Sequence, residues 1–139
     1  ANNHYVFEIT ETIEMDRIPA VERVFKEFIK NDFRLAIDDF GTGYSNYGYM
    51  RDKIFDIVKV DRSFITDIDK QRNNYLMVSF IIKMAHEMGL HVCIEGVETK
   101  EELSCVKKLG ADYIQGYYYG KPVCLQDFEE QHLKRFVLG

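Results

Sequence analysis

Five short runs of the chain alternate apolar and polar residues, and longer stretches with helical spacing lie between them. We expect strands at 6–10, 33–40, 57–61, 91–97 and 113–119. In the second run, one side carries Phe33, Leu35 and Ile37. The other side carries Arg34, Ala36 and Asp38. Alternation with a period of two indicates a strand whose two faces meet different surroundings.

Apolar residues at helical spacing predict helices over 20–30, 74–88 and 126–136, and Pro19 suits a first helical turn. Thr99 and Glu102 form a capping-box pattern that opens a short helix ending before Gly110. The helix over 74–88 is expected to bury one stripe, namely Met77, Phe80, Ile81, Met84, Ala85 and Met88. For 20–30 the stripe is Val21, Val24, Phe25, Phe28 and Ile29. Alternating strands and helices predict a parallel sheet in one domain.

The second face of each expected strand carries a polar group near its carboxyl end: Glu8, Asp38, Lys59, Glu95 and Gln115. A doubly wound sheet is covered on both faces, so its strands read as almost wholly apolar. A barrel has helices on one side only and gathers its active site at the carboxyl ends of its strands. The pattern favours the barrel. The alternative is that these residues simply meet solvent where the strands end, which is strained for five consecutive strands.

Length and charge narrow this interpretation. The chain has 139 residues, whereas a complete (β/α)₈ barrel needs about 200–250, so we expect only part of a barrel. The net charge of -5 argues against broad binding to nucleic acid or to an anionic membrane. No stretch approaches the roughly 18–20 apolar residues of a membrane span. Cys93, Cys105 and Cys124 are too far apart for a metal-type pair and are expected to be buried free thiols in a reducing cytoplasm.

Four carboxylates, Glu8, Asp38, Asp39 and Glu95, would meet at one rim of this sheet. Like charges at that range repel, and a divalent cation relieves the repulsion. An all-oxygen donor set suits Mg²⁺ or Mn²⁺ best, and Ca²⁺ would bind too. Lys59 lies where an anionic oxygen or an activated water could sit, and two metals with a lysine are typical of water attack on a phosphodiester. The glycine-rich segment 40–45 could approach a phosphate, although a plain turn explains it equally well.

Five segments together carry a resemblance: Glu8-Ile-Thr-Glu11, 38–45 (DDFGTGYS), 58–64 (VKVDRSF), 95–99 (EGVET) and 115–122 (QGYYYGKP). They resemble, in order and spacing, successive motifs of the EAL family of bacterial cyclic di-GMP phosphodiesterases. The resemblance covers nearly the whole chain. It implies a (β/α)₈ TIM-type barrel, of which this chain (1–139) would hold five C-terminal β-α units, strands four to eight. The family's earlier strands, with a metal-ligating Glu and Asn, would be absent.

The resemblance also implies the chemistry, which is opening of cyclic di-GMP to linear pGpG by water attack assisted by two Mg²⁺ or Mn²⁺ ions, with Ca²⁺ inhibitory. It implies that Glu8 ligates one metal, that Asp38 bridges both, and that Asp39 and Glu95 serve the second. The isolated fragment is expected to be inactive. The alternative is a degenerate EAL-like module that binds the nucleotide or a protein partner without catalysis.

Further roles follow from the same resemblance. Lys59 would hold or activate the attacking water, Gln115 would orient water or substrate, Glu98 would support the site, and Glu11 would brace the loop 39–45. The substrate-binding residues would be Gly41, Thr42, Gly43, Tyr44, Ser45 and Tyr117, although strand packing explains Tyr117 equally well. Because five strands leave exposed edges, we expect a homodimer formed by edge pairing or swapping. The expected location is cytoplasmic, with a parent protein that could be membrane-anchored.

Overall fold

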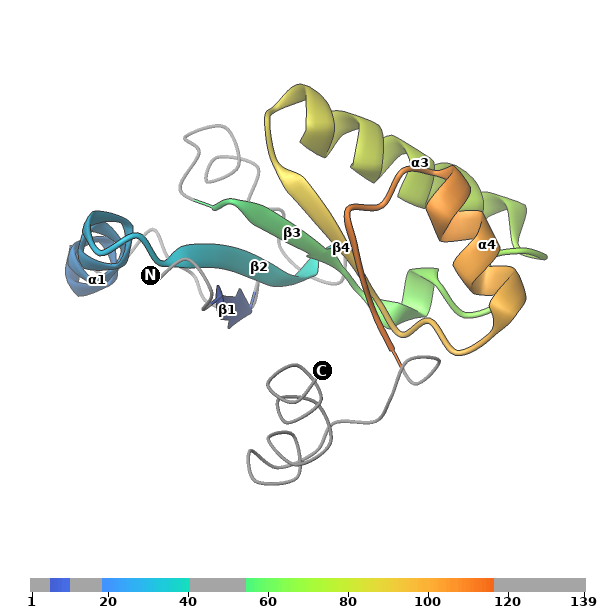
Figure 1. Cartoon of the computed structure of the whole chain (residues 1–139), viewed down its shortest axis with the longest axis horizontal. Coiled ribbons are helices and arrows are strands. Elements are labelled where there is room, and N and C mark those ends of the chain that lie inside the picture. The colour runs from blue at the N-terminus through green and yellow to red at the C-terminus, as the bar shows by residue number, and fades with distance from the viewer. Residues whose placement is uncertain (1–5, 11–18, 41–54, 117–139) are drawn as a thin grey trace, which may run out of the picture.

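The strands form one parallel sheet in the computed structural model, which describes residues 6–10, 19–40 and 55–116. They are β1 (Val6–Thr10), β2 (Arg34–Phe40), β3 (Ile57–Val60), β4 (His91–Glu95) and β5 (Tyr113–Gln115), and they pair in chain order. The sheet curls into a half-barrel with helices on its outer side (Figure 1). The expected parallel α/β fold is confirmed.

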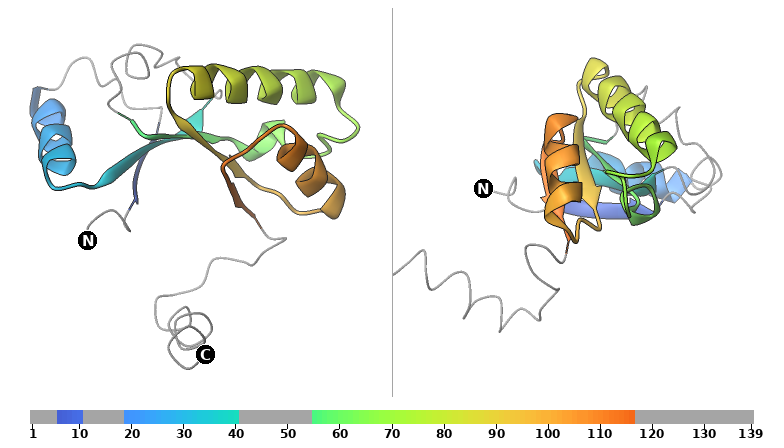
Figure 2. Two further views of the ribbon diagram at one scale, coloured as in Figure 1. Left: turned by 45° about the horizontal axis from the view of Figure 1, so that its top comes forward. Right: turned by 90° about the vertical axis from the view of Figure 1, so that its right-hand side faces the viewer.

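The helices are α1 (Pro19–Lys30), α3 (Arg72–Glu87) and α4 (Lys100–Lys108), with a short 3₁₀ turn η3 (Arg62–Phe64) after β3. Figure 2 shows α3 and α4 on the side of the sheet away from its concave face. The capping box that opens α4 is confirmed, because Thr99 Oγ1 accepts from the N–H of Glu102 and the Glu102 carboxylate accepts from the N–H of Thr99. The expected helix over 126–136 lies outside the described residues.

Three strands, β3, β4 and β5, end earlier than expected, and the first two do so for a local reason. β3 ends at Val60 because the side chain of Asp61 accepts from the N–H of Ser63 and starts η3. β4 ends at Glu95 because Gly96 has a φ of 81°, a left-handed conformation that does not continue a strand. Both early ends put a loop directly after the residues that carry the expected chemistry.

The core lies between the outer face of the sheet and the helices. Leu35, Val58 and Val92 are completely buried on that face. Helices α3 and α4 cover them with the buried residues Val78, Ile81, Ile82, Ala85, Leu103 and Val106. The loop after η3 adds Ile65 and Ile68, so the apolar layer continues past the ends of the strands.

The expected buried stripe of α3 is wrong in part. Phe80 is 62% exposed and Met77 is 47% exposed, whereas Val78, Ile81, Ile82 and Ala85 are buried. The buried set has the same i, i+3, i+4, i+7 spacing as the expected one, so the helix carries two overlapping apolar stripes. In α1, Phe25 is buried while Val24 and Ile29 are about half exposed, so the stripe expected there is also only partly used.

Asp112 ties the starts of β4 and β5 together. Its Oδ2 accepts from the N–H of Val92 at 2.7 Å and lies 2.7 Å from Nε2 of His86 on α3. Burial on its own would raise the pKa of Asp112, but the hydrogen bonds from His86 and Val92 outweigh it and lower that pKa. These contacts of Asp112 lie at the end of the sheet opposite the expected site.

The thiols of Cys93 and Cys105 are free, as expected, but only partly buried. Cys124 lies outside the described residues. Within 6–10, 19–40 and 55–116, no helix is long and apolar enough to cross a membrane.

Candidate functional site

Glu8 reaches the concave face because its neighbour Phe7 is held on the other side. The ring of Phe7 stacks on Phe28 of α1 at 4.5 Å and meets the edge of Phe33 at 5.1 Å. Successive side chains of a strand point to opposite faces, so this aromatic contact on the outer side turns Glu8 inward. The aromatic cluster thus fixes the first strand and the carboxylate that it carries.

An irregularity between β2 and β3 lies at the Asp38-Asp39 pair. Ile37 is opposite Val58 and Phe40 is opposite Val60, so two residues of β2 face the single residue Lys59. An extra residue of this kind bends the strand, breaks the strict alternation of faces and is common beside active sites. The described part of the pair, the Asp38 side chain, lies on the concave side near Lys59.

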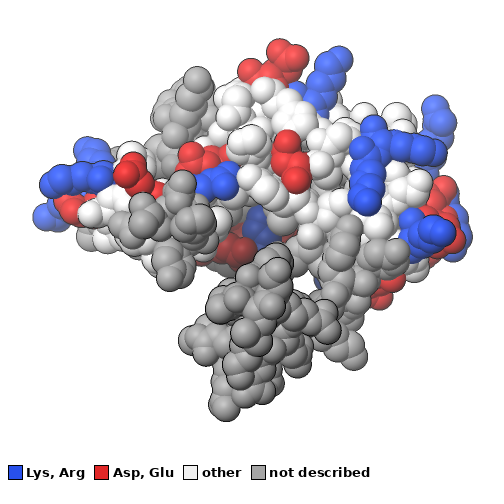
Figure 3. Space-filling view, in the orientation of Figure 1, with Lys and Arg blue, Asp and Glu red and all other residues white. Residues whose placement is uncertain are grey.

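Lys59 is the centre of the site. It is only 3% exposed, and its Nζ donates to Oε1 of Glu8 at 2.7 Å and lies 3.7 Å from Oδ1 of Asp38. Three different strands therefore place one positive and two negative groups together. Figure 3 shows acidic and basic atoms meeting in a recess near the middle of the molecule, while most other charges lie on the outside.

The carboxylates keep the buried ammonium charged. Burial alone would lower the pKa of Lys59, but its hydrogen bond to Glu8 and the charges of Glu95, Glu8 and Asp38 raise it above its usual value. Lys59 is therefore protonated at neutral pH and serves as a hydrogen-bond donor and fixed charge. It is not a general base under those conditions.

Cys93 lies opposite Lys59 on β4 and extends the site. Burial raises the pKa of its thiol to about 11, although the charge of Lys59 acts in the other direction. The thiol is therefore neutral at pH 7 and is not an activated nucleophile. Sequence reasoning treated this cysteine only as a buried thiol and missed its place beside the lysine.

Glu95 and Gln115 face each other across β4 and β5. Glu95 is partly buried, its Oε2 is closed off from solvent, and its charge acts on Lys59. Gln115 is exposed at the edge of the sheet, and its backbone carbonyl accepts from the N–H of Gly96 at 2.9 Å. The structure thus brings Glu8, Asp38, Lys59 and Glu95 into one electrostatic group and places Gln115 beside it.

The concave face forms a hollow of about 180 Å³ beside this group. Its lining is mostly apolar and includes Glu8 and Lys59 of the charged group. The lining residues are Val6, Glu8, Arg34, Ala36, Ile57, Lys59, Cys93 and Tyr113. Small apolar hollows with a few convergent polar groups are typical of binding sites.

Divalent cations suit the chemistry of the donors. Glu8 and Asp38 both approach one positive charge, the Lys59 ammonium, and they offer only oxygen. In the described part of the chain, no group of three or more His, Cys, Asp or Glu residues is arranged to hold a metal ion. The side chain of Asp39, an expected ligand, lies outside the described residues, as do Glu11, Tyr117 and the segment 41–45.

The remaining expected site residue, Glu98, lies beside Arg62 of η3. Its Oε1 lies 3.8 Å from a guanidinium nitrogen of Arg62, and both side chains are exposed. Its backbone N–H donates to Glu102, a buried carboxylate on α4. The capping-box pattern in the sequence signalled Glu102, but not that its carboxylate also reaches the loop after β3.

The sequence of this chain is similar to those of known proteins. The family model for the EAL domain matches residues 1–122. The chain is 37% identical over 123 residues to the cyclic di-GMP phosphodiesterase NbdA of Pseudomonas aeruginosa, a match that covers 88% of this chain and 16% of that protein.

Solved structures agree with the sequence match. The EAL enzyme Bd1971, in its cAMP- and cyclic di-GMP-bound form, is 36% identical with a TM-score of 0.84, over 93% of this chain and 34% of that one. BlrP1 of Klebsiella pneumoniae, in a complex with manganese and cyclic di-GMP, is 31% identical with a TM-score of 0.74, over 84% and 30% of the two chains. The chain therefore spans about a third of these structures and a smaller share of the curated relative.

Proposed function

Because this chain belongs to the EAL domain family, we propose that its concave face is part of the active site of a metal-dependent phosphodiesterase that opens cyclic di-GMP to linear pGpG. The observation that carries the proposal is the buried Lys59 ammonium between Glu8 and Asp38. A charged group that is already fixed in a site with little water can stabilise the charge that develops on a phosphate, because it does not have to reorient during the reaction. Its neighbours supply the carboxylates that a divalent cation needs.

The proposed division of roles follows the position of each group. Glu8, Asp38, Asp39 and Glu95 would hold two Mg²⁺ or Mn²⁺ ions, which lower the pKa of a bound water and stabilise negative charge. Lys59, which stays protonated, would donate a hydrogen bond to the attacking water or to a phosphate oxygen. Gln115 would orient water or substrate from the neighbouring strand, and Glu98 would support the site through its contact with Arg62.

Segments outside the described residues complete the proposal. The loop 41–45 would bind the phosphate, Glu11 would brace that loop, and Tyr117 would stack on a guanine base. The five β-α units would correspond to strands four to eight of an eight-unit barrel, so the 139-residue chain alone would be inactive. Ca²⁺ would occupy the metal positions without supporting hydrolysis. Among the described residues, β1 and β5 form the two edges of the sheet, and such edges would favour a homodimer of the isolated chain.

One observation favours a second candidate, a module that binds cyclic di-GMP without hydrolysing it. Lys59 already neutralises Glu8 and Asp38, and no group of three ligands is assembled among the described residues. In that case the ammonium would pair with the phosphodiester of the bound nucleotide. The phosphodiesterase would need a metal ion to release pGpG, whereas the binding module would bind the nucleotide with or without metal.

The experiment that separates them uses the protein that carries this chain. Cyclic di-GMP is incubated with Mn²⁺, with Ca²⁺ and with chelator, and pGpG is measured by liquid chromatography while nucleotide binding is measured by calorimetry. Release of pGpG with Mn²⁺ alone supports the phosphodiesterase. Binding that is equal in all three conditions, with no pGpG, supports the binding module and overturns the proposal. The isolated 139-residue chain, assayed in parallel, should release none.

A further inference from the structure

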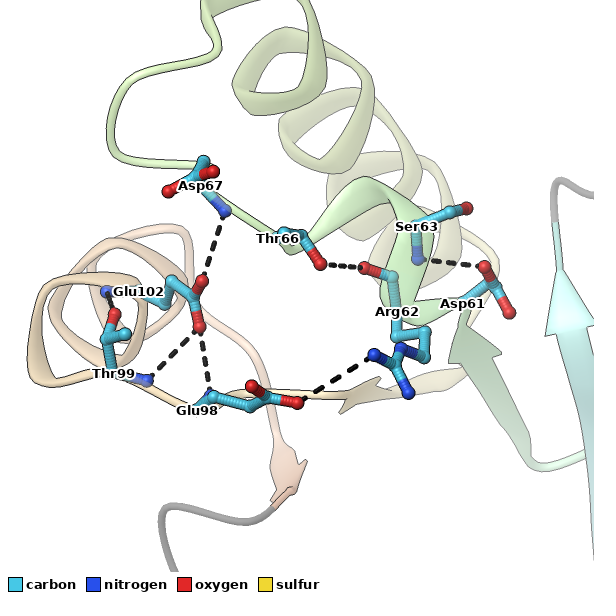
Figure 4. A network of polar contacts seen from close by, with 8 residues as sticks. All are labelled: Asp61, Arg62, Ser63, Thr66, Asp67, Glu98, Thr99 and Glu102. Carbon is cyan, nitrogen blue, oxygen red and sulfur yellow. Dashed lines mark hydrogen bonds and ion pairs between the residues drawn. The ribbon is translucent and has the colours of Figure 1, made fainter.

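Glu102 is a buried carboxylate that joins two loops. It is 4% exposed, and its Oε2 accepts from the N–H groups of Glu98 at 2.9 Å and Thr99 at 3.2 Å. Its Oε1 accepts from the N–H of Asp67 at 3.1 Å, as Figure 4 shows. A capping box explains the bond to Thr99 but not the bond to Asp67, which comes from a different loop.

The loop after β3 and the loop after β4 approach each other closely along this line. Asp67 has a φ of 55°, a conformation that a residue with a side chain seldom adopts unless its surroundings hold it. A Cβ at Gly96 would collide with the Cβ of Arg62, so the two backbones fit together only with glycine there. The exposed ion pair between Arg62 and Glu98 is a further contact between the two loops, as Figure 4 shows.

These contacts begin where strand pairing stops. The last paired residues of β3 and β4 are Val60 and Ile94, so Lys59 lies just before the end of the pairing and Glu95 just after it. Glu95 has no opposite residue on β3, and its register partner is Gln115 on β5. The place of Glu95 relative to Lys59 is therefore set by its pairing with Gln115 on one side and, on the side of β3, by how the two loops beyond the pairing are held.

We propose that Glu102 is a positioning residue that clamps the β3 loop to the β4 loop and thereby sets the place of Glu95 relative to Lys59. As a claim about catalysis it rests on the proposed function. As a claim about geometry it does not, because the clamp exists whether or not the protein hydrolyses a nucleotide. A displacement of about 1 Å at a reacting centre is enough to lower a rate by up to a hundredfold.

Glu102→Gln tests the clamp without emptying the buried space. Glutamine has one acceptor oxygen, so it can satisfy the N–H groups of Glu98 and Thr99 or that of Asp67, but its amide then points a donor at the other loop. Glu102→Ala removes all three bonds and can fail to fold. The matched control is Thr99→Ala, which removes the other half of the capping box and leaves the Asp67 bond in place.

Two measurements are made on the protein that carries this chain. The first is hydrogen exchange over 61–67 together with the backbone amide resonance of Lys59, neither of which needs activity. Glu102→Gln should speed exchange in 61–67 and move that resonance, while Thr99→Ala should change exchange only in the first turn of α4. The second is hydrolysis of cyclic di-GMP with Mn²⁺, where Glu102→Gln should lower kcat about tenfold at unchanged KM and Thr99→Ala should not.

Each outcome decides the proposal. Unchanged exchange and an unmoved Lys59 resonance in Glu102→Gln overturn the clamp, whatever the activity. Faster exchange with a kcat equal to that of Thr99→Ala shows a merely structural residue and overturns the positioning role. If the unaltered protein releases no pGpG, the proposed function fails, and the geometric claim then stands or falls on the Lys59 resonance alone.

Discussion

The Nζ of Lys59 lies 2.7 Å from Oε1 of Glu8, although their strands are not neighbours and β2 runs between them. In a flat sheet, strands two apart are separated by about 9.5 Å. The curl of the sheet, together with the length of both side chains, closes that distance. The contact is therefore a property of the half-barrel, and it depends on both strands keeping their places in the curl.

Replacing the thiol of Cys93 should change how stability depends on alkaline pH. Its pKa is raised to about 11 in the folded chain, so the unfolded chain loses this proton first, near pH 8.5. The stabilising effect is complete below that value and is lost as the pH rises through about 11. The loss should amount to about 3 kcal/mol.

Urea unfolding of the unaltered chain and of Cys93→Ala between pH 7 and pH 11 measures this. The alanine variant should show a flatter curve over that range. Cys105→Ala is the control, because Cys105 packs at the helices and not beside Lys59. Parallel curves for the unaltered chain and Cys93→Ala would contradict the burial of this thiol.

Gly96→Ala should destabilise the fold strongly. Gly96 has a φ of 81°, and an added Cβ would meet Arg62 in the loop after β3. The backbone strain and the collision together should cost about 3 kcal/mol or more. Gly89→Ala is the matched control, because Gly89 has a φ of 76° but open space around its Cβ position.

The Gly89→Ala control should lose only the stability that backbone strain costs, about 1–2 kcal/mol. Chemical unfolding of both variants gives the difference between them, which reports the packing of the two loops. Equal losses for the two glycines would mean that the loops do not pack as closely as the structure shows.

Asp112→Asn should weaken the contacts that join the starts of β4 and β5, at the end of the sheet opposite the candidate site. The asparagine oxygen can still accept from the N–H of Val92, but the charge-assisted bond to His86 is lost. Because the pKa of Asp112 is lowered, its contribution is present above the unfolded value near 3.9 and is lost as the pH falls through the folded value.

At pH 6 the variant should be less stable by about 1 kcal/mol, and the difference should shrink as the pH falls below the unfolded value. Thermal unfolding at pH 6 and at pH 3 checks this. A difference of the same size at both values would rule out the carboxylate as its source. At each pH the variant is compared with the unaltered chain, so the general effect of acid on the stability of the chain cancels.

Much of the fold could be predicted because the signals were local. The alternation in β2 and the capping box at Thr99 depend on residues close in sequence, and both are confirmed. The buried stripe of α3 could not be chosen, since Met77 and Val78 start two stripes of equal spacing. Only the position of the sheet decides between them.

The site divides in the same way. The strand-end positions of Asp38 and Lys59 predicted that these residues would meet, and they lie 3.7 Å apart. The extra residue in β2 could not be foreseen, because a register exists only between two strands. The reach of Glu102 to Asp67 was also hidden, since it joins residues 35 positions apart.

The most direct test of the proposed site compares two lysine variants of the protein that carries this chain. Lys59→Met removes the buried ammonium, whereas Lys70→Met removes an exposed one whose side chain is 71% accessible and pairs with the loop residue Asp67. Release of pGpG from cyclic di-GMP with Mn²⁺ is measured for both. The proposed site predicts a loss of about a hundredfold or more for Lys59→Met and an unchanged rate for Lys70→Met. Hydrolysis by folded Lys59→Met at the unaltered rate would contradict it.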